Sequence, residues 1–164
     1  MTPAGSKPAG GRVMLTISSD PVRMADVRET VRQAGQQIGF VDPDLACLVL
    51  AVDEAIANVI RHGYEGRPGQ PIEIVLEPIR RESGLGLQVV ICDCGRQVDP
   101  ATIAGRDLNN VRPGGLGTHI IRSIMDEVEY TCRDTEGMQL RMVKMLKPRA
   151  DGETECPAAS VKKE

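Results

Sequence analysis

"AVDEAIANVIRHGY", residues 51–64, is the stretch of this 164-residue sequence that says most about its fold. It is the second half of a segment with helical periodicity, which we expect to begin after Asp42-Pro43 and to run to about Arg61. One face of this helix is continuous and aliphatic, as expected for a helix that packs on a core. That face consists of Leu45, Leu48, Val49, Val52, Ile56, Val59 and Ile60.

Glu54 and Asn58 project from roughly the opposite side of the same helix and stack one turn apart. A carboxylate and a carboxamide there suit a general base beside a ligand for a metal ion or a phosphate, because Glu accepts protons and an amide oxygen binds hard cations. Their neighbours are apolar, so we expect a second surface to cover them. Taken alone, this helix favours the alternative of a solvated polar pair with incidental neighbours. Those neighbours are Cys47, Leu50, Ala51 and Ala57.

A second candidate site lies in "VVICDCGRQVDP", residues 89–100. An apolar run too continuous for an exposed strand stops at Asp93, and the chain turns at Gly95. A carboxylate at this position can accept a hydrogen bond from an exocyclic amino group, and the glycine lets a flat ring approach the backbone. The alternative is an Asx-type turn at a strand end, which is the commoner explanation for these two residues by themselves.

A third candidate site is the glycine-rich stretch "RPGGLGTHIIRSIMDEVEY", residues 112–130. Gly114, Gly115 and Gly117 lead into a helix that we expect to begin near Thr118. Glycines followed by a helix N-terminus suit a phosphate-binding lid, because unpaired backbone N–H groups and the positive end of the helix dipole face an anion. The alternative is an ordinary loop. The sequence contains neither a P-loop nor a G-x-G-x-x-G motif, so a nucleotide site here would be of another kind.

The remaining elements predict an α+β fold, a two-layer sandwich with helices on one face of a mixed, mostly antiparallel sheet. The expected order is a strand, two helices, two strands, a loop with a helix, and a closing hairpin. Asp20, followed by Pro21, is expected to cap the start of the first helix, and Gly39 is expected to end it. We divide the chain into a flexible leader (1–11), one domain (12–147) and a flexible polar tail (148–164). The expected strands are 12–17, 72–79, 85–92, 128–134 and 138–146.

Composition excludes some classes of function. The formal net charge is −3 and aromatic residues make up 2% of the chain, which argues against a direct nucleic-acid ligand. The odd number of cysteines, without CxxC spacing, favours reduced thiols in a cytoplasmic protein. No apolar stretch approaches the length that spans a membrane, so we expect no membrane association.

The three motifs, taken together and in this order, resemble the N, G1 and G2 boxes of the GHKL (Bergerat-fold) ATPases. More narrowly, His62-Gly63-Tyr64 and the "GGLG-x-H" and "MDEV-x-Y" patterns resemble the stand-alone serine kinases that act as anti-sigma factors in bacterial partner-switching systems. The resemblance covers about residues 12–147. It departs from the superfamily pattern at Arg96-Gln97, where many members carry a second glycine, and at Thr118, which is often aliphatic.

The resemblance implies a role for each candidate residue. Glu54 would activate the accepting hydroxyl, and Asn58 would hold Mg²⁺ against the phosphates of ATP. Asp93 would read the adenine amino group, with Gly95 against the ring. The lid and the start of its helix would comprise Gly114, Gly115, Leu116, Gly117 and Thr118.

The resemblance therefore implies an ATP- and Mg²⁺-dependent protein serine kinase. Its substrate would be an anti-anti-sigma protein of the STAS type, and it would sequester a sigma factor as a homodimer. The alternative is a nucleotide-binding switch that sequesters its partner without phosphotransfer. Arg23, Arg28 and Arg32 border the apolar face of the first helix and would form part of a partner surface, with ordinary solvation as the alternative.

Overall fold

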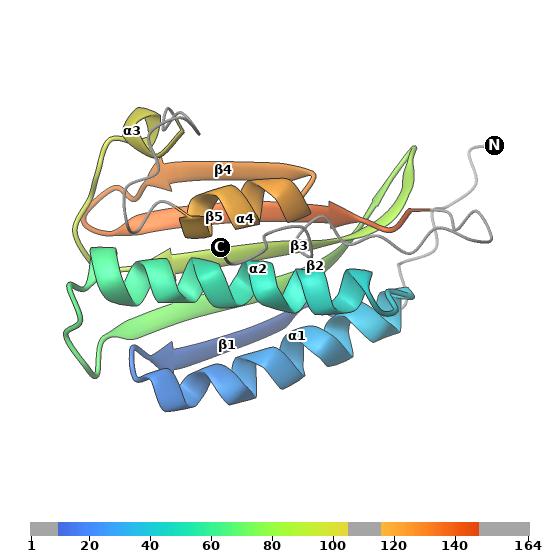
Figure 1. Cartoon of the computed structure of the whole chain (residues 1–164), viewed down its shortest axis with the longest axis horizontal. Coiled ribbons are helices and arrows are strands. Elements are labelled where there is room, and N and C mark those ends of the chain that lie inside the picture. The colour runs from blue at the N-terminus through green and yellow to red at the C-terminus, as the bar shows by residue number, and fades with distance from the viewer. Residues whose placement is uncertain (1–9, 105–115, 148–164) are drawn as a thin grey trace, which may run out of the picture.

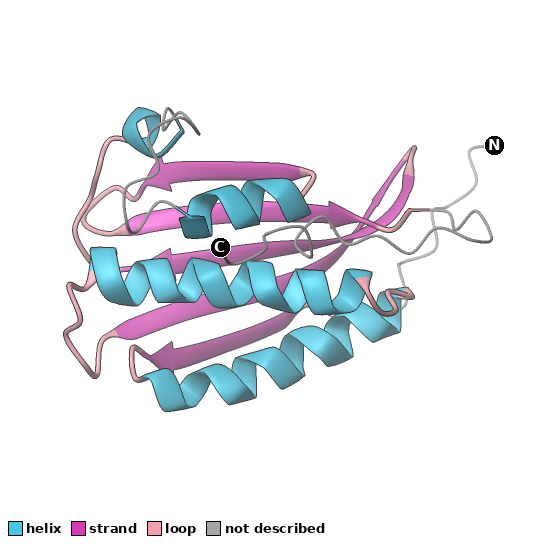
Figure 2. Ribbon diagram, viewed as in Figure 1, coloured by secondary structure: helices cyan, strands magenta, loops and turns pink. Residues whose placement is uncertain are grey.

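The computed structural model describes residues 10–104 and 116–147 and shows two layers, a sheet covered by helices on one face (Figures 1 and 2). A 3₁₀ turn (Pro21–Arg23) precedes the first helix, and one turn of π-helix (Val59–Gly63) follows the second. The short helix α3 was not expected from the sequence. The helices are α1 (Met24–Ile38), α2 (Asp44–Asn58), α3 (Pro100–Ala104) and α4 (Leu116–Ile124); the strands are β1 (Val13–Ser18), β2 (Pro71–Arg81), β3 (Gly84–Asp93), β4 (Glu127–Cys132) and β5 (Met138–Met145).

The sheet has the strand order β1-β2-β3-β5-β4. Each pairing between these strands is antiparallel, so the sheet is more regular than the mixed sheet expected, while the α+β class is confirmed. The pairing of β2 with β3 sets Ile72 opposite Asp93. Asp93 is therefore the last residue of the central strand, and it lies at the same end of the sheet as the turn between β4 and β5.

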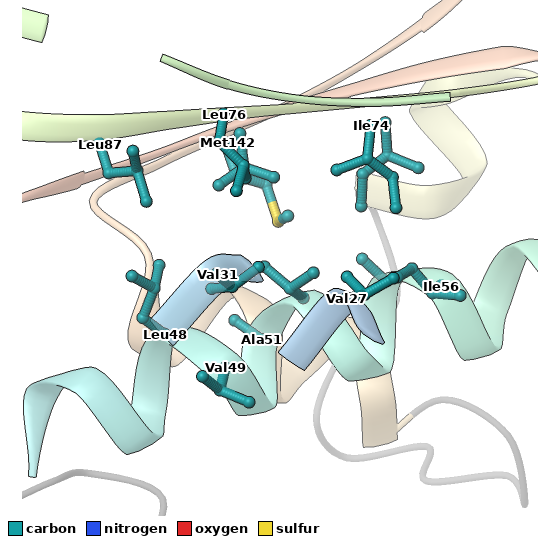
Figure 3. Close-up of a cluster of buried hydrophobic side chains, with 14 of the residues drawn as sticks. Val27, Val31, Leu48, Val49, Ala51, Ile56, Ile74, Leu76, Leu87 and Met142 are labelled. Carbon is teal, nitrogen blue, oxygen red and sulfur yellow. The ribbon is translucent and has the colours of Figure 1, made fainter. Parts of the chain in front are cut away.

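The core lies between the sheet and the two long helices (Figure 3). Val27 and Val31 of α1 and Leu48 of α2 are fully buried against aliphatic side chains of the sheet. The predicted apolar face of α2 is buried over most of its length, and only its last two members, Val59 and Ile60, are partly exposed. The sheet side of the core in this view is formed by Ile74, Leu76, Leu87 and Met142.

The ends of α1 agree only in part with the sequence prediction. Gly39 ends the helix with a φ of 113°, a left-handed conformation that favours glycine. Asp20, expected as a cap, makes no capping hydrogen bond because its Oδ2 accepts from Ser18 Oγ at 2.5 Å. The α-helix consequently starts at Met24, after the 3₁₀ turn.

The arginines of α1 and of the 3₁₀ turn before it are engaged within the chain. Arg28 Nε lies 2.6 Å from Asp53 Oδ2 of α2. The other two form looser pairs, Arg23 with Asp26 at 3.7 Å and Arg32 with Asp42 at 4.0 Å. These pairs support the alternative of an ordinary charged surface, and a partner surface on α1 stays a prediction.

Two further expectations concern the whole chain. Cys92, Cys94 and Cys132 are free thiols, but Cys47 is disulfide-bonded, so the expectation of reduced thiols is wrong at Cys47. Within residues 10–104 and 116–147, no helix is long and apolar enough to cross a membrane.

Candidate functional site

A cavity of about 300 Å³ lies where α2, the end of β3, the hairpin of β4 and β5, and the first turn of α4 meet. Asn58 and Thr118 line it together with Asp93, so three of the candidate residues from distant parts of the sequence share one cavity. The remaining lining is largely apolar. It includes Ala55, Val59, Ile91, Val98, Ile103, Tyr130, Met138 and Leu140. An apolar cavity with a few polar groups is typical of a small-molecule site.

Glu54 and Asn58 are covered by α4, which is the second surface expected from the sequence. A Cβ atom added at Gly117 would lie 2.7 Å from Glu54 Oε2 and 3.3 Å from Asn58 Oδ1. Glu54 also lies 3.9 Å from Arg61 Nη2, and about a quarter of its side chain (26%) is exposed. Glu54 is thus adjacent to the cavity but does not line it, whereas Asn58 does.

Asp93 is buried, with 4% of its surface exposed, and its carboxylate is held by the backbone. Its Oδ1 accepts hydrogen bonds from Gly95 N at 2.8 Å and from Met138 N at 3.3 Å. The Asx-type turn considered from the sequence is therefore present. Within the described part of the chain Oδ2 accepts no hydrogen bond, which leaves an acceptor for a ligand in the cavity.

Burial raises the pKa of Asp93 above its ordinary value. The hydrogen bonds from Gly95 and Met138 and the positive charge of Arg133 act in the opposite direction. The protonation state of Asp93 therefore depends on the groups around it, Arg133 among them.

Contacts within the chain explain why residue 95 is a glycine. A side chain there would collide with the carbonyl group of Gly63, and Arg96 N donates to Gly63 O at 2.9 Å. The turn of π-helix after α2 is therefore packed directly on the turn after β3. Contact of Gly95 with an adenine ring stays a prediction.

Tyr64 explains why α2 ends as it does. The helix does not run to Arg61 as expected; it ends at Asn58, and Tyr64 N donates to Val59 O at 2.9 Å across the wider π-turn. The buried Tyr64 hydroxyl donates to Pro71 O and accepts from Cys94 N at 2.8 Å. The end of this segment is thus hydrogen-bonded to Pro71 at the start of β2 and to Cys94, the residue after β3.

Only part of the predicted phosphate-binding lid lies within the described residues. Gly114 and Gly115 lie outside the described residues. Leu116 and Gly117 belong to the first turn of α4, which begins before Thr118. Gly117 is therefore a helical residue with α2 packed against it, and a flexible backbone is not the reason for a glycine at this position.

Sequence reasoning missed the part of the site that comes from the β4–β5 hairpin. Tyr130 lines the cavity, and its raised pKa results from burial, opposed by Arg122 and by a hydrogen bond with Thr118. Gly137 has a φ of 80° and lies so close to Asp93 that a side chain would collide with its carbonyl group. The sequence "TEG" predicted only a turn, and its position beside Asp93 depends on strand order.

A metal ion would find few protein ligands here. The described residues contain no group of three or more His, Cys, Asp or Glu side chains that could hold one. Asn58 Oδ1 is an oxygen ligand of the type that Mg²⁺ accepts, and Mg²⁺ is commonly held by one or two protein groups plus the phosphates of a nucleotide. The site therefore fits Mg²⁺ only as part of a nucleotide complex.

On this sandwich, one cavity is lined by a buried aspartate, a helical asparagine and the first turn of a second helix. This combination is typical of a histidine kinase-like ATPase domain. The family model with the description "Histidine kinase-like ATPase domain" matches residues 17–144, and the chain belongs to this family. The superfamily resemblance inferred from the three motifs is thereby confirmed.

The chain is similar to two curated serine-protein kinases. One is the serine-protein kinase RsbW of Bacillus pumilus (strain SAFR-032), with 27% identity over 152 residues that cover 87% of this chain and 91% of the relative. The other is the serine-protein kinase RsbW of Halalkalibacterium halodurans, with 25% identity over 142 residues, or 82% and 83% of the two chains.

Solved structures show the same fold. The SiaB-SiaC complex from Pseudomonas aeruginosa contains a chain with a TM-score of 0.58 and 15% identity, over 79% of this chain and 88% of that one. The RsbU and RsbW domains of Rv1364c from Mycobacterium tuberculosis match with a TM-score of 0.57 and 18% identity, over 87% of this chain and 34% of that longer one.

Proposed function

We propose that this protein is a serine/threonine kinase that uses ATP with Mg²⁺ to phosphorylate an anti-anti-sigma protein with a STAS domain. It also sequesters a sigma factor as a homodimer, in a bacterial partner-switching system in the cytoplasm. The observation that carries the proposal is the meeting of Asn58, Asp93 and Thr118 at one cavity, with Glu54 one helical turn from Asn58. The name serine-protein kinase, which both relatives described above carry, supports phosphotransfer to serine.

The two ends of the cavity suit the two ends of ATP. Asp93 accepts a hydrogen bond from the adenine amino group, and apolar side chains such as Ile91 and Leu140 surround the ring. The first turn of α4, with Thr118, presents backbone N–H groups to the phosphates. Asn58 would hold Mg²⁺ against the phosphates, where the ion would offset their negative charge.

Glu54 is the candidate general base. In this role its carboxylate accepts the proton of the serine hydroxyl as the phosphoryl group is transferred. Gly117 packs against Glu54 Oε2, while 26% of the Glu54 side chain stays exposed to solvent. We expect the first turn of α4 to shift at its contact with α2 as the serine approaches Glu54.

The same contact favours a second candidate function. With Glu54 outside the cavity lining and paired with Arg61, the protein could bind nucleotide and change its affinity for a partner without transferring phosphate. This alternative has the same nucleotide site and differs in the role of Glu54.

A phosphotransfer assay separates the two functions. The partner is isolated by pull-down from native lysate with and without ATP, and phosphosites are mapped on the proteins that co-purify. Glu54→Ala should keep nucleotide binding and lower phosphotransfer by about 10²- to 10⁴-fold, the usual contribution of a positioned base. Glu29→Gln, on the exposed side of α1, serves as the control with one carboxylate fewer.

Two results would contradict the kinase proposal. One is a captured STAS protein that carries no new phosphate after incubation with ATP and Mg²⁺. The other is phosphotransfer at the parental rate by Glu54→Ala, which would remove Glu54 from the mechanism.

A further inference from the structure

The turn between β4 and β5 makes several hydrogen bonds to Asp93 that do not involve the ligand-facing oxygen Oδ2. Arg133 Nη1 donates a hydrogen bond to the carbonyl oxygen of Asp93 at 2.8 Å. Arg133 N donates to Gly137 O at 3.1 Å, which closes the turn, and the next residue, Met138, donates its N–H to Asp93 Oδ1. The main chain and the carboxylate of Asp93 are thus both held from this one turn.

A second link runs in the opposite direction, from the loop after β3 to the same turn. Gln97 Nε2 donates to the carbonyl oxygen of Arg133 at 2.6 Å. Gln97 belongs to the Arg96-Gln97 pair that departs from the glycine common in the superfamily. The Gln97 side chain holds the loop after β3 in place, whereas a glycine there would leave the loop backbone more conformational freedom.

We propose that Gln97 and Arg133 form a clasp that positions Asp93 for the adenine base. The proposal rests on the proposed ATP site and adds to it two positioning residues, neither of which lines the cavity. Arg133 holds the main chain of Asp93, and Gln97 holds the main chain of Arg133, so the two links act in series on Asp93.

The clasp has an electrostatic consequence as well as a geometric one. Asp93 accepts from an adenine amino group as a carboxylate, and burial opposes this charged form. The guanidinium of Arg133 lowers the pKa of Asp93 against that effect. Without Arg133, Asp93 should therefore hold its proton to a higher pH.

Other titratable and charged groups face Asp93 and remain in place when Arg133 is changed. Tyr64 and Cys92 each show an electrostatic interaction with Asp93 in their own raised pKa, for which burial is the first cause. Cys94 Sγ lies 3.5 Å from Arg133 Nη1. His62 and Arg96 line the same cavity.

The first test needs no nucleotide. The pKa of Asp93 is followed by NMR on the free protein labelled with ¹³C at aspartate carboxyl groups, for the parent, Arg133→Met and Arg133→Lys. We expect Arg133→Met to raise the pKa of Asp93 and Arg133→Lys, which keeps the charge, to return most of the shift. Arg80→Met, at the far end of β2, is the matched control and should leave the pKa unchanged.

The second test uses nucleotide binding measured by calorimetry with ATP and GTP. We expect Arg133→Met to weaken ATP binding roughly tenfold at neutral pH and to reduce the preference for ATP over GTP, because one hydrogen bond to a buried group is lost. The acidic limb of ATP binding should move to higher pH. Gln97→Ala should have a smaller effect and should add little in the Arg133→Met background, since both changes open one clasp.

The outcomes separate this inference from the proposed function. An unchanged Asp93 pKa and unchanged ATP affinity in folded Arg133→Met would overturn the clasp and leave the ATP site standing. If the parent binds no ATP, the proposed function fails, and the Asp93 pKa in the free protein still decides whether Arg133 acts on that carboxylate. If Arg133→Met does not fold, Arg133→Gln removes the charge with a smaller change of shape, and Gln97→Ala tests the second link of the clasp through ATP affinity.

Discussion

At the scale of single residues, the site depends on side chains that are shared between ligand binding and folding. Asp93 Oδ1 is used by two backbone N–H groups, and among residues 10–104 and 116–147 nothing donates to Oδ2, which remains for a ligand. Gly95 and Gly137 are glycines because other parts of the chain press against them. A substitution at the site therefore changes both functions unless it keeps the shape of the residue.

Asp93→Asn keeps that shape and tests the ligand function. We expect it to weaken ATP binding by about 1 to 3 kcal/mol, because a charged acceptor in a desolvated pocket is replaced by a neutral one. The amide oxygen can still accept from Gly95 N, so the domain should remain folded. Calorimetry measures the affinity, with Glu82→Gln in the distant turn between β2 and β3 as the control; equal affinities for Asp93→Asn and the parent would exclude Asp93 from base recognition.

Glu127 allows a prediction about pH. Hydrogen bonding with Arg81, and then with Arg141, lowers the pKa of Glu127 from 4.5 to about 2. Because this pKa is depressed in the folded state, the ion pairs stabilise the fold above the unfolded pKa, and the stabilisation is lost as pH falls from about 4.5 toward 2.

We therefore expect Glu127→Gln to melt at a lower temperature than the parent at neutral pH and at a similar temperature near pH 2. Because Glu127 is exposed to solvent, high salt should reduce the difference. Melting followed by circular dichroism across this pH range measures it, and a difference that does not change with pH would show that the ion pairs contribute nothing.

At the scale of elements, α4 is the piece that joins the site to the rest of the fold. Its first turn covers Glu54 and Asn58 through Gly117. Its last turn is held by Lys144, a buried residue of β5 whose Nζ donates to Ile124 O at 2.6 Å. A cation at the C-terminal end of a helix also interacts favourably with the helix dipole.

Lys144→Met should loosen the far end of α4 while keeping most of the packing. We expect a loss of about 1 to 2 kcal/mol in the free energy of unfolding, because the carbonyl of Ile124 loses a charged donor in a buried setting. Urea denaturation measures this loss. The exposed Lys147 provides the control substitution Lys147→Met, and an equal effect of both changes would argue against the specific hydrogen bond.

Gly117→Ala tests the first turn of α4. Alanine favours the helix by up to about 1 kcal/mol over glycine, and the nearest atom to its new methyl group is the movable end of Glu54. We expect a domain that stays folded, with a melting temperature near that of the parent, but with Glu54 displaced and phosphotransfer strongly reduced. Full phosphotransfer in this variant would mean that displacing the Glu54 carboxylate from its position beside Gly117 does not affect catalysis.

Elements with a clear period were predictable from the sequence, whereas their mutual contacts were not. The apolar faces of α1 and α2 follow from spacing alone, and a covering surface over Glu54 followed from the apolar neighbours of that residue. The π-turn after Asn58 could not be read from the sequence, because it is imposed by Tyr64, which reaches across to Pro71 and Cys94. The role of the β4–β5 turn depended in the same way on a strand order that local patterns do not contain.

At the scale of the whole molecule, α4 has one side toward the cavity and one side toward solvent. Gly117 packs on α2 and Thr118 lines the cavity, whereas Leu116 is 46% exposed beside them. A ligand in the cavity that moves the first turn of α4 would therefore also move the exposed side chain of Leu116. A partner that contacts Leu116 could respond to the nucleotide without touching it.

This coupling predicts different hydrogen exchange in two nucleotide complexes. ATP carries a γ-phosphate that can accept hydrogen bonds from the N–H groups at the start of α4, and ADP lacks it. Residues 116–124 should therefore be better protected in the complex with a non-hydrolysable ATP analogue than with ADP, while α1 exchanges equally in both. Leu116→Ser should leave this difference intact and weaken partner binding, because it changes only the exposed side of the turn. Identical exchange of residues 116–124 in the two complexes would contradict the coupling, since a partner at Leu116 could then receive no information about which nucleotide is bound.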